Sequence, residues 1–202
     1  MRDRTVIVDG RRMVSERVRH VILDRDGVLN EEAPDRGYVR TPSEWRWIPG
    51  ALEGLAMLAA AGICVSVATN QSGVGRGIMT SSDLEAVHAQ MREAVVSAGG
   101  AISAVFVCPH APTEGCRCRK PLPGLIVAAI KASGISPAAT LLVGDDVRDL
   151  QAARAAGIES VLVLTGKGRQ AAATLTDGPF PVYLDLKAVA HWLINADGRT
   201  GE

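Results

Sequence analysis

The sequence predicts an α/β protein built on a doubly wound parallel sheet, and two observations carry this prediction. Short runs rich in Val, Ile and Leu alternate along the chain with longer segments in which apolar residues recur at helical spacing. The short runs are continuously apolar, which is typical of strands that helices cover on both faces of a sheet. Strands and helices that alternate in this way pair in parallel through right-handed crossovers, so a Rossmann-like core is expected.

The apolar runs are the expected strands, and they span residues 18–24, 63–70, 104–109, 140–145, 160–165 and 181–186. Ala- and Leu-rich segments between them are the expected helices, at residues 51–62, 81–100, 124–134 and 149–157. Each of these segments ends in a glycine, which suits the left-handed residue that closes many helices. His88 falls in the second of these segments and His191 on a later predicted helix, and both are interpreted as surface or packing residues.

The 202 residues are enough for one domain with a full hydrophobic core. We expect a single domain over residues 18–195, an N-terminal extension over residues 1–17 and a short tail over residues 196–202. The extension contains two β-prone runs around Asp9 and Gly10, a pair that favours a tight hairpin turn. A small hairpin and an extended arm are both compatible with that pattern.

The composition argues against several classes of function. The formal net charge is zero and no long block of one sign occurs, whereas nucleic-acid grooves and polybasic membrane anchors need excess cations. The first residues lack the apolar core of a secretion signal, and no apolar run is long enough to span a bilayer. A cytoplasmic protein without nucleic-acid or membrane partners is therefore expected. Thiols stay reduced in that compartment, so clustered cysteines indicate a metal before a disulfide.

Polar side chains follow four of the expected strands at the point where each strand ends. Asp24-Arg25-Asp26 follows the first, and the run TNQSG from Thr69 follows the second. A Cys- and His-rich stretch follows the third, and Gly144-Asp145-Asp146 follows the fourth. Ligands of open α/β sheets bind at the carboxyl ends of the strands, so the sequence places a candidate site there.

The carboxylates at these strand ends indicate a hard metal ion. Asp24 and Asp26 lie beside a buried strand, where unpaired charges are costly. Together with Asp145 they offer the oxygen ligands that Mg²⁺ shares with a substrate phosphate. Asp149 lies four residues after Asp145. It is interpreted either as a residue of the site or as a helix cap, and the sequence favours neither interpretation.

The other polar residues at the strand ends suit phosphoryl transfer. Lys120 and the Thr69 hydroxyl can neutralise phosphoryl oxygens, and a metal-bound Asp can attack phosphorus to form an aspartyl phosphate. The chain lacks a GxxxxGK[ST] loop, which argues against a nucleotide kinase.

The stretch CPHAPTEGCRCRKP at residues 108–121 holds three of the four cysteines. Its paired C-x-H and C-x-C spacing is that of a closed tetrahedral Cys₃His zinc site, with the ligands Cys108, His110, Cys116 and Cys118. A loop of buried reduced thiols without metal is the alternative. Cys64 falls inside an apolar strand and is interpreted as a core residue.

Four segments, DRDGVLN, TNQSG, CRKP and VGDDVRD, occur in this order and resemble the four motifs of the haloacid dehalogenase superfamily. The CPH and CRCRKP segments narrow the resemblance to the family of D-glycero-D-manno-heptose 1,7-bisphosphate phosphatases and the sibling histidinol phosphatases. The match covers residues 18–170. It implies a core without a separate cap domain, in which a structural zinc loop stands in for the cap.

The resemblance implies a role for each matching residue. Asp24 would be the nucleophile, Asp26 the general acid and base, and Thr69 and Lys120 would stabilise the phosphoryl group in transfer. The implied Mg²⁺ ligands are Asp24, the backbone carbonyl of Asp26, and Asp145. The implied substrate contacts are Asp35, Gly37, Tyr38, Asn70, Gln71, Ser72, Arg119 and Asp146.

The activity implied by the resemblance is Mg²⁺-dependent removal of the 7-phosphate of a heptose 1,7-bisphosphate, in the synthesis of nucleotide-activated heptose for surface polysaccharide. A histidinol-phosphate phosphatase is the alternative, and a zinc-stabilised binding protein without turnover is a third hypothesis. The well-known heptose bisphosphatases carry Lys directly after the fourth-motif Asp, whereas this chain carries Asp146. This departure leaves the anomer and the substrate open. A monomer is expected.

Overall fold

The computed structural model describes residues 17–33, 37–175 and 180–196. The expected N-terminal hairpin or arm, up to residue 16, lies outside these residues, as does the expected tail from residue 197. Asp35, one of the implied substrate contacts, also lies outside them. These three expectations stay predictions.

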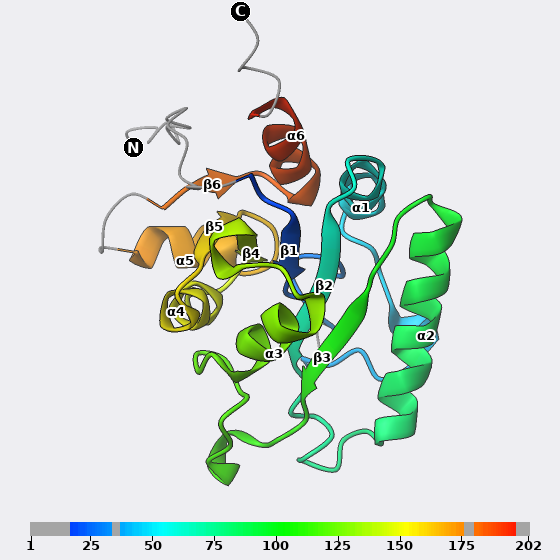
Figure 1. Ribbon diagram of the computed structural model, residues 1–202. Coiled ribbons are helices and arrows are strands. Elements are labelled where there is room, and N and C mark those ends of the chain that lie inside the picture. Colours follow the sequence, from blue (N-terminus) through cyan, green and yellow to red (C-terminus); the bar gives the residue numbers. More distant parts are fainter. Residues whose placement is uncertain (1–16, 34–36, 176–179, 197–202) are drawn as a thin grey trace, which may run out of the picture.

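Parallel strands form one six-stranded sheet in the order β3-β2-β1-β4-β5-β6, as Figure 1 shows. The strands are β1 (His20–Leu23), β2 (Cys64–Asn70), β3 (Ala104–Cys108), β4 (Thr140–Gly144), β5 (Glu159–Val163) and β6 (Val182–Tyr183). This topology confirms the predicted doubly wound parallel sheet. The strand order reverses between β1 and β4, and such a reversal opens a crevice for ligands at the carboxyl ends of the two strands.

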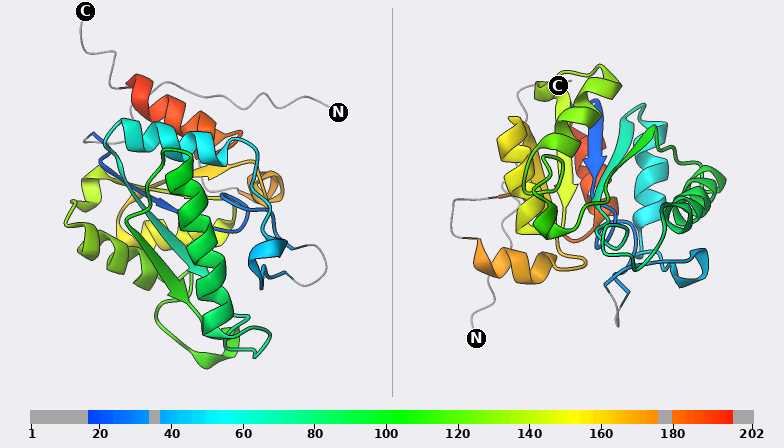
Figure 2. Two further views of the ribbon diagram at one scale, coloured as in Figure 1. Left: turned by 90° about the vertical axis from the view of Figure 1, so that its right-hand side faces the viewer. Right: turned by 90° about the horizontal axis from the view of Figure 1, so that it is seen from below.

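Helices cover both faces of the sheet, with α1 and α2 on one side and α3 and α4 on the other (Figure 1). The first layer consists of α1 (Ala51–Ala60), α2 (Ser81–Ser97) and α6 (Leu186–Ala196), and Figure 2 shows α6 lying against α1. The second layer consists of α3 (Gly124–Ser133), α4 (Val147–Ala156) and α5 (Gly168–Thr174). Within the residues that the structure describes, no helix is both long and apolar enough to cross a membrane.

Alternating side chains along each strand build an apolar core on each face of the sheet. In β1, Val21 and Leu23 join the core under α1 and α6, whereas Ile22 joins the core under α3 and α4. All three are completely buried, and burying an aliphatic side chain of this size contributes about 1.5–3 kcal/mol. The continuously apolar strand pattern is therefore a consequence of two covered faces.

The last strand is shorter than we predicted. We expected a strand at residues 181–186, but β6 spans only Val182–Tyr183, and Leu186 is the first residue of α6. The Asp185 carboxylate accepts a hydrogen bond of 2.8 Å from the backbone N–H of Ala188 and so caps this helix. Leu186 is buried in the core under α1 and α6, so helix capping and packing outweigh the β-prone pattern.

Candidate active site

A cavity of about 270 Å³ lies at the carboxyl ends of β1, β2 and β4. Most of the expected site residues line it, namely Asp24, Asp26, Gly37, Tyr38, Thr69, Asn70, Ser72, Arg119, Lys120, Asp145 and Asp146. They come from segments far apart in the sequence, which the parallel sheet brings to one edge. The cavity therefore lies where the sequence placed the candidate site.

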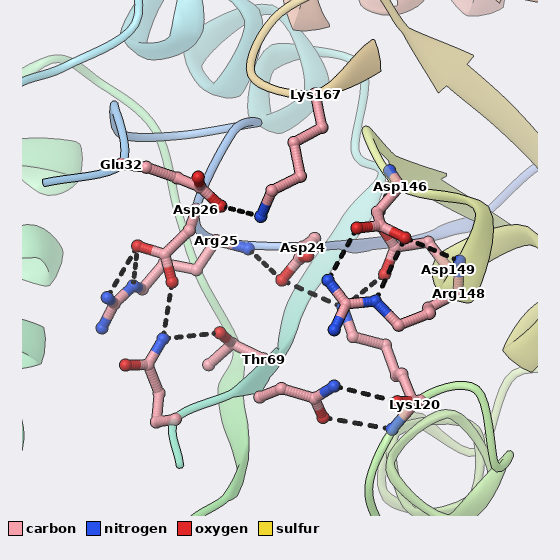
Figure 3. A network of polar contacts seen from close by, with 12 residues as sticks. Asp24, Arg25, Asp26, Glu32, Thr69, Lys120, Asp146, Arg148, Asp149 and Lys167 are labelled. Carbon is pink, nitrogen blue, oxygen red and sulfur yellow. Dashed lines mark hydrogen bonds and ion pairs between the residues drawn. The ribbon is translucent and has the colours of Figure 1, made fainter. Parts of the chain in front are cut away.

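Three carboxylates meet in this cavity. One oxygen from each of Asp24, Asp145 and Asp149 lies within 4.8 Å of the others. The Lys120 ammonium lies 3.0 Å from Asp24 Oδ1 and 2.5 Å from Asp149 Oδ1 (Figure 3). Asp149 also accepts a hydrogen bond of 3.1 Å from the backbone N–H of Asp146, as part of the capping box of α4. Asp149 thus caps a helix and pairs with Lys120 at the same time.

The electrostatics of the three carboxylates favour a bound cation. Burial, reinforced by the charges of Asp149 and Asp26, raises the pKa of Asp24 to about 7 against the opposing charge of Lys120. Burial and the charges of Asp24 and Asp149 raise the pKa of Asp145 to about 8. The charge of Lys120 opposes the rise for Asp24 and that of Lys167 opposes it for Asp145, but neither restores the ordinary pKa. The oxygen donors therefore fit a hard divalent cation.

The backbone holds the Asp145 carboxylate tightly in place. Gly27 and Gly166 have φ angles of +86° and +52°, which favour glycine. A Cβ atom would lie 1.9 Å from Asp145 Oδ2 if added to Gly27, and 2.1 Å from it if added to Gly166. The backbone N–H of Lys167 donates to the same oxygen at 2.8 Å. The two glycines therefore make room for a carboxylate that the backbone orients.

Asp26 has partners of its own, apart from the three-carboxylate cluster. Arg25 donates to Asp26 Oδ1 through Nε at 3.3 Å and a terminal nitrogen at 2.8 Å, and Asn30 donates to the same oxygen at 2.9 Å. Burial alone would raise the pKa of Asp26, but the charge of Arg25 and these hydrogen bonds hold it below its ordinary value. Asp26 is therefore stabilised as a carboxylate.

Gln71 corrects one of our expectations. The family resemblance implied a contact with the sugar, but the side chain is completely buried and does not line the cavity. Its amide nitrogen donates to Asp26 Oδ2 at 2.6 Å and to the Thr69 hydroxyl at 2.9 Å. Because its amide nitrogen donates to these two cavity residues, Gln71 supports Asp26 and Thr69.

Asn70 joins the end of β2 to the backbone of Lys120. Its side-chain nitrogen donates to the Lys120 carbonyl at 3.0 Å, and its side-chain oxygen accepts from the Lys120 N–H at 3.1 Å. The amide expected to touch substrate is thus occupied by backbone. Burial would lower the pKa of Lys120, but the charges of Asp149 and Asp24 raise it, so the ammonium stays charged.

The Cys₃His set is assembled in the loop that follows β3. Cys108 Sγ lies 3.6 Å from Cys116 Sγ and 3.7 Å from His110 Nδ1, and Cys118 Sγ lies 3.3 Å from the same nitrogen. All four donor atoms lie within 4.8 Å of one another. Tetrahedral zinc with bonds of about 2.0–2.3 Å separates its ligand atoms by about 3.3–3.8 Å. The spacing of these atoms therefore fits one zinc ion.

Comparison with known proteins places these features in a family. The family described as HAD-hydrolase-like matches residues 117–189. The chain is 44% identical over 178 residues to the D-glycero-beta-D-manno-heptose-1,7-bisphosphate 7-phosphatase of Bordetella bronchiseptica, which covers 86% of this chain and 97% of the relative. The chain belongs to the heptose 1,7-bisphosphate phosphatase family of haloacid dehalogenase-like hydrolases.

Further members of the heptose bisphosphatase family agree in sequence and structure. The enzyme of the same name from Pseudomonas aeruginosa is 45% identical over 175 residues, covering 86% of this chain and 97% of the relative. The crystal structure of D,D-heptose 1,7-bisphosphate phosphatase from B. bronchiseptica, complexed with magnesium and phosphate, matches with a TM-score of 0.83 and 42% identity. That match covers 88% of this chain and 99% of the solved chain.

In the present chain, four charged residues that we did not predict also line the cavity, namely Glu32, Arg76, Arg148 and Lys167. Arg148 donates to both carboxylate oxygens of Asp146, through Nε at 3.1 Å and a terminal nitrogen at 2.6 Å. Lys167 forms an ion pair with Glu32 (Figure 3). Arg148 stands inside the segment VGDDVRD and could have been considered there, whereas no sequence signal marks Glu32 or Lys167.

The remaining histidines and cysteine lie away from the cavity wall. His88 is buried on α2 and contacts Arg25, whereas His191 is exposed on α6. Cys64 was expected in the core, but it is only half-buried. It is the first residue of β2, at the amino-terminal end of the strand, and its sulfur lies 3.2 Å from the Ser103 hydroxyl.

Proposed function

We propose that this chain is a Mg²⁺-dependent phosphatase that removes the 7-phosphate of D-glycero-D-manno-heptose 1,7-bisphosphate. The observation that carries the proposal is the pairing of Asp24 with Lys120 beside Asp145, in a chain 44% identical to a relative of that name. A carboxylate nucleophile, a cation and a divalent-metal cradle at one strand end are the components that phosphoryl transfer needs.

The proposed reaction has two steps. An Asp24 carboxylate oxygen attacks phosphorus, the bond between phosphorus and the sugar oxygen breaks, and that oxygen takes a proton from Asp26. Water then attacks the phosphorus of the aspartyl phosphate, returning a proton to Asp26 and releasing inorganic phosphate and the Asp24 carboxylate. The negative charge of the bound phosphoryl group favours the protonated form of Asp26 that the first step requires. Thr69 and Lys120 hold the phosphoryl oxygens.

Two metal ions complete the proposal. Mg²⁺ would be held by Asp24, Asp145 and the backbone carbonyl of Asp26, and it would neutralise the charge on the nucleophile and the phosphoryl group. Zn²⁺ would be held by the Cys₃His set and would be structural. The distance between the Asp24 and Asp145 oxygens supports the Mg²⁺ site, and the distances among the Cys₃His donor atoms support the Zn²⁺ site.

The remaining cavity residues would bind the sugar and its second phosphate. Arg119 is suited to the second phosphate because a guanidinium pairs with phosphate through two parallel hydrogen bonds. Tyr38 and Ser72, joined by a hydrogen bond of 2.8 Å, would present hydroxyls to the sugar. Gly37 and Asp146 complete the proposed substrate contacts within the cavity, and Asp35 is proposed from the family resemblance, whereas Asn70 is engaged with the Lys120 backbone.

Relatives of both anomeric specificities resemble this chain. The B. bronchiseptica and P. aeruginosa relatives carry the beta anomer in their names, at 44% and 45% identity. The relative from Mycobacterium bovis has the alpha anomer in its name and is 39% identical over 145 residues. We therefore propose the beta anomer as substrate, with a product that feeds nucleotide-activated heptose for surface polysaccharide.

The relatives reported above are heptose bisphosphatases, so the histidinol-phosphate alternative is not favoured. We propose that the chain works as a monomer in the cytoplasm, with a small sugar phosphate as its partner and with neither nucleic acid nor membrane.

The test is phosphate release from the alpha and beta anomers of the heptose bisphosphate and from histidinol phosphate, in Mg²⁺, with Asp24→Asn as the blank. We expect the beta anomer to give the highest kcat/KM and Asp24→Asn to lower it by at least about 10³-fold. Faster hydrolysis of histidinol phosphate would overturn the proposed substrate. Phosphate release that survives Asp24→Asn would overturn the proposed nucleophile.

A further inference from the structure

Arg25 is a buried cation with no role in the chemistry proposed above. Its side chain has no exposed surface, and a buried guanidinium is costly unless its donors are paired. Those donors are divided between two residues, Asp26 on one side and His88 on the other. The guanidinium carbon also lies 5.7 Å from the centre of a Trp45 ring. Every contact named here fixes the guanidinium in one place.

The two carboxylate oxygens of Asp26 differ in how many donors they accept. Oδ1 accepts three N–H groups, two from Arg25 and one from Asn30, and Figure 3 shows the two from Arg25. Oδ2 accepts one, from Gln71. A carboxylate oxygen has two lone pairs, so Oδ1 is saturated while Oδ2 keeps a free position. A proton that Asp26 gives or takes is therefore carried at Oδ2.

His88 is the residue at the far end of this chain of contacts. It belongs to α2, is 2% exposed, and its Nε2 lies 3.2 Å from a terminal nitrogen of Arg25. A guanidinium only donates, so Nε2 must accept, which requires a neutral imidazole. Burial and the charge of Arg25 lower the pKa of His88 to about 4, in agreement with that requirement.

We propose that His88 is a positioning residue: by accepting from Arg25 it holds the guanidinium against Asp26 Oδ1 and so aims Oδ2 at the leaving oxygen. The inference rests on the proposed function, in which Asp26 protonates that oxygen. Without an acceptor at position 88, a buried Arg25 donor loses its partner and the guanidinium turns to find another. The Asp26 carboxylate, which shares the guanidinium, then loses its orientation, and a displacement of about 1 Å can cost about 10²-fold in rate.

This role predicts that a defect depends on the leaving group. A sugar phosphate releases an alkoxide, which needs its proton while the bond to phosphorus breaks, whereas 4-nitrophenyl phosphate releases a stable phenolate that needs none. The ratio kcat/KM covers the steps up to release of the leaving group, so it excludes the later hydrolysis of the aspartyl phosphate. A misplaced Asp26 therefore lowers kcat/KM for the heptose bisphosphate alone.

The experiment measures kcat/KM for both substrates with the Mg²⁺-loaded chain and its variants. For the heptose bisphosphate we expect Asp26→Asn to lower it by about 10²–10⁴-fold and His88→Leu by about 10–100-fold. For 4-nitrophenyl phosphate we expect changes within about threefold. His88→Gln, whose side-chain oxygen accepts as Nε2 does, should recover most of the loss. Val87→Ala, buried on the same helix, is the matched control and should leave the ratio of the two substrates unchanged.

Two results would overturn the inference, and they are distinguishable. In the first, His88→Leu lowers kcat/KM equally for both substrates, while Asp26→Asn lowers it for the heptose bisphosphate only. His88 then only supports the fold, and the proposed function stands. In the second, Asp26→Asn also lowers kcat/KM equally for both substrates. The acid role of Asp26 then fails, and the inference fails with it. If His88→Leu does not fold, Arg25→Lys makes the same test, because lysine keeps the charge and loses the forked contact.

Discussion

Gly27 shows how a residue without a side chain controls the geometry of the carboxylates. Its backbone lies so close to Asp145 that a Cβ atom would overlap the carboxylate at 1.9 Å, and its φ of +86° already disfavours other residues. We expect Gly27→Ala to push Asp145 out of the cluster and lower phosphatase kcat/KM by more than about 10²-fold. Steady-state kinetics and magnesium titration of the folded variant measure this effect.

Gly62→Ala is the matched control for this substitution. Gly62 has a similar φ of +69°, but nothing lies within 4 Å of the added Cβ atom. Both variants should lose about 1 kcal/mol of folding free energy from backbone strain, and only Gly27→Ala should lose magnesium affinity and activity. Equal activity in the two variants would show that Asp145 tolerates displacement.

At the scale of elements, β2 holds the loop that ends in Lys120. Asn70 makes this connection by pairing with both backbone groups of Lys120, as neighbouring strands do. Asn70→Asp turns a donor into an acceptor that faces the Lys120 carbonyl, at a cost of about 1–3 kcal/mol. Because Lys120 stabilises the transition state, we expect kcat to fall by about tenfold or more while KM changes little. Steady-state kinetics on the heptose bisphosphate measure the two parameters.

Asn195→Asp makes the same chemical change on α6, away from the cavity, and should leave kinetics unaltered. A rise in KM with kcat preserved in Asn70→Asp would instead show that Asn70 binds the sugar directly, as the family resemblance implies.

The Cys₃His loop is the second element that places Lys120. Cys116→Ser removes one ligand of the set, and we expect the protein to lose its zinc, several kcal/mol of folding free energy and most of its activity. Elemental analysis, thermal unfolding and phosphate release measure the three effects. Cys64→Ser is the matched control because Cys64 lies outside the set. Full activity of a zinc-free Cys116→Ser variant would contradict the scaffold role of the loop.

At the scale of the whole molecule, His20 links stability to pH. It is completely buried in β1, 3.0 Å from the Ser66 hydroxyl, and burial lowers its pKa from 6.5 to about 4. Between these values the unfolded chain holds more protons than the folded one, so the stabilising contribution is lost as pH falls. The free energy of unfolding should therefore fall less between pH 7 and pH 5 in His20→Gln than in the parent chain, by about 1–2 kcal/mol. Urea unfolding at the two pH values measures this difference.

Comparison with the parent chain is essential for this measurement. The raised pKa values of Asp24 and Asp145 act in the opposite direction, since they favour protonation in the folded state. Only the difference in unfolding free energy between variant and parent gives the contribution of His20. An unchanged slope in His20→Gln would show that His20 takes up its proton without unfolding.

The sequence by itself determined the fold class, the strand ends that carry the polar residues and the donors of the Cys₃His set. These features are local, because strand patterns repeat every two residues and ligand spacing is counted along one loop. The sequence-based prediction made β6 too long, because the last residue of that apolar run begins α6. It also missed the seven-residue α5. Short apolar runs carry no periodicity that separates strand from helix.

Only the tertiary structure decided which side chains share a partner. Arg25 stands between two expected catalytic residues, yet its second partner, His88, is 63 residues away. Asn70 and Gln71 were both expected at the substrate, but folding turns one to the Lys120 backbone and the other to Asp26. Buried donors and acceptors must be paired, and the sheet topology decides which of them come within reach. That is why the reacting residues can be recognised from motifs while the residues that orient them cannot.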